Sequence, residues 1–172
     1  MLSIIIVNYN GLKLLLDCIA SIEKHADVPY EIIVVDNASC DGSIELLKER
    51  YPQVRLIEND CNIGFAGGNN IGGRAAIGDL FLLLNNDTKL LTSLKPAVKR
   101  FEEDKRIGVL GCRMYFNDRS FQDSMGFEHT PLRVVLTWTG LHRLTTSLLF
   151  REIDFDRTHY EKVQNNVDWV TG

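Results

Sequence analysis

The stretch SIIIVNYN, residues 3–10, joins a continuous apolar run directly to a cluster of polar residues. Two later stretches repeat this pattern, EIIVVDN at residues 31–37 and LFLLLNND at residues 80–87. Continuous rather than alternating apolar runs are typical of strands in a parallel sheet that is covered on both faces. Shorter apolar runs at 54–57 and 107–110 predict two further strands.

Helical patterns separate the predicted strands. Apolar residues recur at helical spacing from Leu12 to Ile22, after Asn10 as a predicted N-cap, and more briefly from Ile44 to Leu47. A third helix is predicted over residues 94–101. Strands that alternate with helices predict an α/β domain with right-handed crossovers.

Length and composition are those of a single soluble globular domain. The chain has 172 residues, 45% of them hydrophobic, and a formal net charge of −4. The mildly acidic balance gives no electrostatic reason to expect nucleic-acid binding, which depends on clustered Lys and Arg. No stretch reaches the ~18 uncharged apolar residues of a membrane-spanning helix. The four cysteines lack metal-ligand spacing and indicate reduced thiols in a cytoplasmic protein.

Polar side chains follow three of the predicted strands where each strand ends. In a parallel α/β sheet, ligands bind beyond the carboxyl ends of the strands. We therefore expect one crevice to be lined by Asn8, Tyr9, Asp36, Asn37, Asn85, Asn86 and Asp87. The alternative is that these residues only start turns and cap helices, as Asn and Asp often do. For Asp87, the alternative role is the N-cap of the helix predicted at 94–101.

A glycine-rich stretch, NIGFAGGNNIGGRAAIG, occupies residues 62–78. It matches neither the phosphate-binding pattern G-x-x-x-x-G-K-[ST] nor a G-x-G-x-x-G turn directly after a strand. Small residues here let backbone approach a ligand closely, or let a helix pack tightly against the sheet. Of these two interpretations we favour packing.

Four sequence blocks occur in a characteristic order. They are VNYNG at 7–11, VVDNAS with DGS at 34–43, NIGFAGGNNIG at 62–72, and GD followed by LNNDT within 78–88. Together they resemble the nucleotide-sugar-binding half of a family 2 glycosyltransferase of the rhamnosyltransferase-like kind. The resemblance implies the GT-A fold, a Rossmann-like nucleotide-diphospho-sugar transferase fold with a mixed, mostly parallel sheet flanked by helices.

The resemblance also implies that the chain has two functional parts. It covers residues 1–115 closely, which implies a donor-binding part there. Residues 116–172 match more loosely and resemble the beginning of an acceptor-binding part, incomplete and within the same structural domain.

The implied activity is inverting, metal-assisted transfer of a sugar from a nucleotide-diphospho-sugar to a glycan, lipid-linked or polysaccharide acceptor. Such an enzyme would act in cell-envelope polysaccharide biosynthesis, in the cytoplasm or at the inner face of the membrane. Asp36 would accept a hydrogen bond from the base, and Asp87 would hold Mg²⁺ or Mn²⁺ across the diphosphate. The implied nucleotide-binding residues are Asn8, Tyr9, Asn10, Asp36, Asn37, Asn69, Asn85 and Asn86.

The sequence departs from the family pattern at three places. Asn85 replaces the first carboxylate of the family's D-x-D motif, and Asn69 stands where many relatives have an arginine. The general base is expected beyond Gly172, and Asp168 is interpreted as a strand-end or loop residue. The catalytic residues are therefore unassigned, and a non-catalytic or truncated nucleotide-sugar-binding module remains the alternative.

One further segment bears on partners. Residues 131–150 are apolar with scattered cations, and Trp138, Leu141, Leu144 and Leu148 recur at roughly helical spacing. This pattern describes either an amphipathic helix on a membrane surface or a segment packed in the core or in a homodimer. We favour packing.

Overall fold

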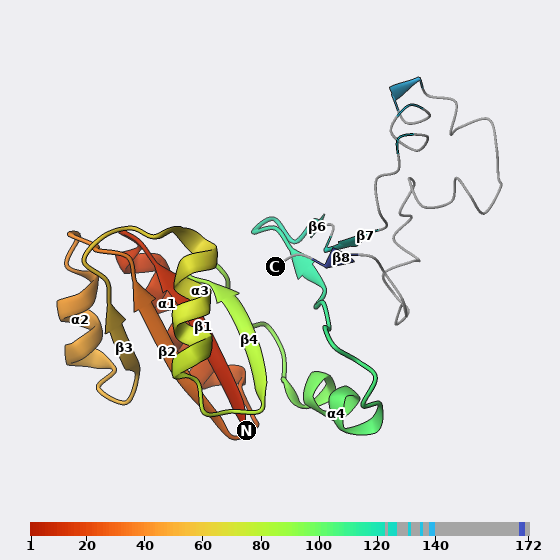
Figure 1. The fold of residues 1–172 in the computed structure, drawn as a ribbon, viewed down its shortest axis with the longest axis horizontal. Helices are drawn as coiled ribbons and strands as arrows, with labels where there is room; N and C mark the ends of the chain where they lie inside the picture. Colours follow the sequence, from red (N-terminus) through yellow and green to blue (C-terminus); the bar gives the residue numbers. More distant parts are fainter. Residues whose placement is uncertain (123, 127–130, 132–134, 136–137, 140–168, 171–172) are drawn as a thin grey trace. The chain divides into compact units, whose positions relative to one another are not determined.

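The computed structural model describes residues 1–122, 124–126, 131, 135, 138–139 and 169–170 (Figure 1). The chain forms two compact units, residues 1–107 and 108–172. The functional division after residue 115 remains a prediction. Asp168 and most of the segment at 131–150 lie outside the described residues.

The first unit is built on a four-stranded sheet in the order β3-β2-β1-β4, with every neighbouring pair parallel. Its strands are β1 (Leu2–Asn8), β2 (Tyr30–Asp36), β3 (Arg55–Glu58) and β4 (Leu80–Asn85). Its helices are α1 (Leu12–His25), α2 (Ser43–Arg50), α3 (Gly64–Ala75) and α4 (Lys95–Glu103). The predicted α/β class, four of the strands and the three helices are confirmed.

Both faces of the central strands β1 and β2 are buried, as their continuous apolar runs predicted, whereas Phe81 and Leu83 leave one face of β4 exposed, which corrects the prediction for that run. On one face, Ile4 and Ile6 belong to the main hydrophobic core together with Leu15 and Ile19 of α1. On the other face, Ile5 lies under α3. Each of these side chains is fully buried. A strand covered on both sides has no solvent-facing positions, so no alternation shows in its sequence.

Helix α3 lies against β1 and β2 (Figure 1), and two of its glycines face the side chains of β1. A Cβ atom on Gly68 would lie 2.8 Å from the Cγ atoms of Val7, and one on Gly72 would lie 2.4 Å from Cγ2 of Ile5. At either position an added Cβ atom would force the facing side chain or the helix to shift. Of the two interpretations of the glycine-rich stretch, packing is the one that this geometry supports.

The strand predicted at residues 107–110 is wrong. The amide of Ile107 donates to the carbonyl of Asp104 in a turn that ends α4, and Val109 is 73% exposed. No strand within the described part of the chain pairs with residues 107–110. A short apolar run that contains a glycine has little strand preference without a partner to pack against.

The described part of the second unit contains two short antiparallel pairs. Strand β5 (Met114–Tyr115) pairs with β6 (Phe121–Gln122), and β7 (Met125–Gly126) pairs with β8 (Trp169–Val170). The rings of Tyr115 and Phe121 pack edge to face, with their centroids 5.9 Å apart. Among the helices that the structure describes, none has the length and apolar character needed to cross a membrane.

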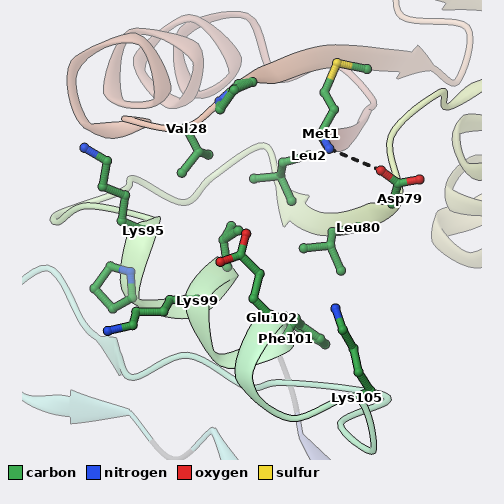
Figure 2. A pocket seen from close by; sticks show the side chains of 13 residues that line it. Met1, Leu2, Val28, Asp79, Leu80, Lys95, Lys99, Phe101, Glu102 and Lys105 are labelled. Atoms are coloured by element: carbon green, nitrogen blue, oxygen red, sulfur yellow. Dashed lines mark hydrogen bonds and ion pairs between the residues drawn. The ribbon is translucent and has the colours of Figure 1, made fainter.

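A cavity of about 1050 Å³ lies between α4 and the amino-terminal edge of the sheet. Leu2 and Leu80 line it from the strands, and Lys99 and Phe101 line it from α4 (Figure 2). The polar strand ends lie at the other edge of the sheet, so this cavity is separate from the crevice that the sequence predicts.

Two adjacent glycines of α3 provide a test of the packing. We expect Gly72→Ala to destabilise the protein, because an overpacking cost of about 1–3 kcal/mol exceeds the gain of ~1 kcal/mol in helix propensity. Gly73→Ala places its Cβ 3.8 Å from Phe81, an ordinary contact, so we expect it to be neutral or stabilising. Urea denaturation measures both variants, and equal stabilities would contradict the packing of α3.

Candidate functional site

The register of the sheet brings the polar strand ends to one edge. Asn8 is paired with Asp36 across β1 and β2, and Val7 is paired with Asn85 across β1 and β4. The loops that follow these strands therefore start side by side.

Asn8 is the residue on which three of these loops converge. Its side chain is fully buried, and its Nδ2 lies 2.9 Å from Oδ1 of Asp36 and 3.2 Å from the hydroxyls of Ser39 and Ser43. The two N–H groups of the amide are thus shared among three acceptors. On its other side, Oδ1 of Asn8 accepts a hydrogen bond of 2.9 Å from Nδ2 of Asn86.

Asp36 and Asn37 are each only 2% exposed and brace the loops from within. Oδ2 of Asp36 accepts a hydrogen bond of 2.8 Å from the amide of Ser39, while Oδ1 accepts from Asn8 and from the Ser39 hydroxyl. The Asn37 side chain donates to the carbonyl of Gly64 and accepts from Nδ2 of Asn59. It thereby ties the end of β2 to the start of the glycine-rich helix.

Tyr9 and Asn10 form the exposed layer above this network. Tyr9 is 53% exposed, and Asn10 has a positive φ of 50°, a conformation that asparagine tolerates better than most residues. The amide of Asn10 donates to Oγ of Ser39, and Oδ1 of Asn10 accepts from the amide of Cys40. The first and second loops are therefore joined along their length, and Tyr9 is presented at the surface.

The predicted N-cap role of Asn10 is wrong, because its side chain is engaged with the second loop. The residue before α1 is Gly11, and the first helical amide, that of Leu12, donates to Oδ2 of Asp41 at 2.9 Å. Oδ1 of Asp41 accepts from the amide of Ser43. One carboxylate thus holds the starts of both α1 and α2, a role that no local spacing in the sequence reveals.

Residues 85–88 form a tight turn after β4. The carbonyl of Asn85 accepts from the amide and the hydroxyl of Thr88, at 3.2 and 2.6 Å. Asp87 is exposed, and no hydrogen bond or ion pair engages its carboxylate within the described residues. Its alternative role as a helix cap is wrong, because Asp27 accepts from the first amides of α4.

Cys18 of α1 lies against this turn, with Sγ 3.7 Å from the carbonyl oxygen of Asn85. The pKa of its thiol is raised to about 12, and burial is the main cause. A hydrogen bond with Thr88 lowers this pKa, and the charge of Asp87 raises it further. The thiol is therefore a neutral donor beneath the turn.

Asn69 lies one turn into α3, and its Nδ2 donates to the carbonyl of Phe65 at 3.1 Å. Its Oδ1 is shielded from solvent and has no hydrogen-bond partner among the residues that the structure describes. No hydrogen bond joins Asn69 to the network around Asn8 in the part of the chain that the structure describes. Its predicted contact with the donor remains a prediction.

The fit of a divalent cation depends on Asp87. No three His, Cys, Asp or Glu side chains gather to hold a metal among the described residues. One free carboxylate beside a polar turn nevertheless suits Mg²⁺ or Mn²⁺, because Mg²⁺ commonly takes one or two protein carboxylates and completes its shell with substrate phosphates and water. The residues present therefore fit a cation that is shared with a diphosphate.

The parallel sheet, its flanking helices and the polar strand ends define a GT-A domain of the nucleotide-diphospho-sugar transferase kind. The chain belongs to glycosyl transferase family 2, whose family model matches residues 3–163.

Relatives and solved structures agree with this assignment. Poly(ribitol-phosphate) beta-glucosyltransferase of Bacillus spizizenii is 29% identical over 96% of this chain and 28% of its own length. S. aureus TarS superposes with a TM-score of 0.62 and 25% identity over 74% of this chain and 24% of TarS. The mannosyltransferase PcManGT from Pyrobaculum calidifontis, solved with GDP-Man and Mn2+, superposes with a TM-score of 0.58 and 26% identity over 67% of this chain and 35% of its own. The chain thus spans about a third or less of these proteins.

The hydrogen bonds that Asp41 accepts at the starts of α1 and α2 give a pH-dependent prediction. Burial raises the pKa of Asp41, but hydrogen bonds from Ser43 and from the amide of Leu12 outweigh it and leave this pKa below its usual value. A depressed pKa contributes stability above the unfolded-state pKa, and this contribution is lost as the pH falls through the folded-state value. We expect Asp41→Asn to cost about 1 kcal/mol at pH 7, as loss of a helix cap does, and the difference to shrink below about pH 4.

Urea denaturation from pH 3 to pH 7 measures this difference. Glu49→Gln is the control, because it removes the same charge from the exposed end of α2 without removing a loop hydrogen bond. If the wild type exceeded Asp41→Asn in unfolding free energy by the same amount at pH 3 as at pH 7, the proposed role of the Asp41 carboxylate would be wrong.

Proposed function

We propose that this chain binds a nucleotide-diphospho-sugar at the carboxyl edge of the β1, β2 and β4 strands and takes part in transferring its sugar to an acceptor. The observation that most supports this proposal is the buried hydrogen-bond network around Asn8. This network joins three loops that leave Tyr9 and Asp87 exposed to solvent. Membership of glycosyl transferase family 2 and the likeness to PcManGT, solved with GDP-Man and Mn2+, support the proposal.

In this proposal the base lies along Tyr9 and Asn10. An ionised carboxylate offers about four acceptor positions, and Asp36 uses three of them within the protein, so one remains on Oδ2 for an N–H group of the base. The Asn85 amide bonds a ribose hydroxyl, Asn69 faces the donor from α3, and Asn37 holds the surrounding loop.

Asp87 would hold Mg²⁺ or Mn²⁺ beside the diphosphate. Bound there, the cation offsets the negative charge that develops on the departing nucleoside diphosphate. The hydrogen bonds of Thr88 to the carbonyl of Asn85 fix the backbone of the turn that carries Asp87.

The reaction class is inverting transfer. The acceptor hydroxyl attacks the anomeric carbon from the face opposite the diphosphate, a general base takes the hydroxyl proton, and the bond to the diphosphate breaks. The general base is unassigned. A glycan, lipid-linked or polysaccharide acceptor of the cell envelope is proposed, at the cytoplasmic side of the membrane. The relative named for poly(ribitol-phosphate) supports a polymer of this kind.

Calorimetric titration with UDP, GDP and dTDP tests the donor site. We expect at least one nucleotide to bind, and to bind roughly tenfold more tightly with Mn²⁺, a difference of about 1.4 kcal/mol. Asp87→Ala should remove the enhancement by Mn²⁺. Asp79→Ala is the matched control, because Asp79 is exposed at the opposite end of β4.

Two results would contradict parts of this proposal. If none of the three nucleotides bound with or without Mn²⁺, the donor site would be wrong. If Asp87→Ala retained the full enhancement by Mn²⁺, the assignment of Asp87 to the cation would be wrong.

Cys40 offers an independent way to locate the nucleotide. It is exposed, with Sγ 3.7 Å from Oδ1 of Asn10, so a nucleotide over Asn10 should shield it. We expect saturating nucleotide to slow alkylation of Cys40 by iodoacetamide severalfold, as followed by peptide mass spectrometry. Cys112, exposed in the second unit, is the internal control. Equal slowing of both thiols, or of neither, would place the nucleotide elsewhere.

A further inference from the structure

We infer that the amide pair Asn8–Asn86, seated against Gly11, couples nucleotide binding at the first loop to cation binding at Asp87. The inference rests on the proposed function and deepens it. It assigns Asn8 and Asn86 as positioning residues, whose principal partners are each other and the surrounding loops.

On the cation side, the position of Asp87 depends on Asn86. The turn at 85–88 is fixed to itself by Thr88 and to β1 by the 2.9 Å hydrogen bond from Asn86 to Asn8. Asp87 is the next residue, and no bond within the described part of the chain holds its carboxylate. The turn therefore sets the position from which the Asp87 side chain extends.

On the nucleotide side, the same Asn8 amide holds the loops that carry the exposed layer. Its Nδ2 donates to Asp36 and Ser39, and Oγ of Ser39 accepts from the amide of Asn10. A continuous chain of hydrogen bonds thus runs from Asn10 through Ser39 and Asn8 to Asn86. A ligand that shifts or rigidifies the Asn10 end of this chain therefore changes the free energy needed to order the Asn86 end, and the reverse also holds.

Gly11 gives an independent sign that the amide pair needs this geometry. A Cβ atom at this position would lie 2.3 Å from Nδ2 of Asn86 and 2.8 Å from Oδ1 of Asn8, the two atoms that form the bond. The φ of Gly11 is −117°, which residues with side chains also adopt. The backbone conformation therefore does not require glycine here, whereas the close approach of the two amides does.

The test measures coupling rather than affinity alone. The quantity is the Kd of the best-binding nucleotide without Mn²⁺ divided by its Kd with Mn²⁺. By linkage, the same factor must appear in the affinity for Mn²⁺ measured with and without nucleotide, and Mn²⁺ electron paramagnetic resonance gives that affinity directly. A residue that only supports the fold would lower stability and leave this ratio unchanged.

Two variants break the pair in different ways while Asp87 is kept. Asn86→Ala removes the donor, and Gly11→Ala pushes the amides apart without removing a polar group. We expect the ratio in both to fall about fivefold or more, toward that of Asp87→Ala. Gly73→Ala is the control for a glycine replaced where space allows, and its ratio should equal that of the wild type.

The outcomes separate this inference from the proposed function. If the wild type binds nucleotide with an enhancement by Mn²⁺ that either variant retains in full while folded, the coupling role is overturned and the donor site stands. If both variants fail to fold by circular dichroism, a structural role accounts for the pair and the inference is overturned. If the wild type binds no nucleotide, the proposed function and the inference fall together.

Discussion

The buried side chain of Asn8 is the constraint on which the arrangement of this site depends. A primary amide removed from water must find partners for two N–H groups and an oxygen, or its burial costs on the order of 1–3 kcal/mol for each group left unpaired. The register of β1 against β2 supplies Asp36 as one partner, and the turn after β4 supplies Asn86 as another. Satisfying one amide therefore fixes the relative positions of three loops.

The packing of α3 completes the arrangement from the other face of the sheet. Because Gly68 and Gly72 bring the helix close to β1 and β2, the start of α3 lies within reach of the end of β2. The Asn37 side chain spans this short distance by donating to the carbonyl of Gly64. A bulkier helix would hold that carbonyl farther away, so small residues that serve the core also shape the loops of the site.

The sequence predicts β1 and β2 well because burial on both faces leaves a continuous apolar run, and it finds β4 from the same kind of run although Phe81 and Leu83 leave one face of that strand exposed. It fails at residues 107–110, where a short run has no partner strand. The sequence also places Asp36 and Asp87 in one crevice, but it does not predict that one is buried and the other exposed. Asp36 is 2% exposed and Asp87 is open to solvent, since burial is set by loops from distant parts of the chain. Asp41 is missed for the same reason, because the helix start that it holds lies 29 residues away.

The order Asn-Asn-Asp after β4 follows from the same network. Three oxygen acceptors face Nδ2 of Asn8, which orients its amide and leaves Oδ1 toward position 86. Only a donor can meet that oxygen, so an aspartate at 86 would set two acceptors against each other, whereas asparagine forms the observed bond. At position 85 the amide side chain adds no second charge to the turn, while the backbone carbonyl of the same residue accepts from the buried thiol of Cys18. The turn therefore carries one carboxylate, at 87, and a cation held there would depend on phosphate oxygens for much of the rest of its coordination.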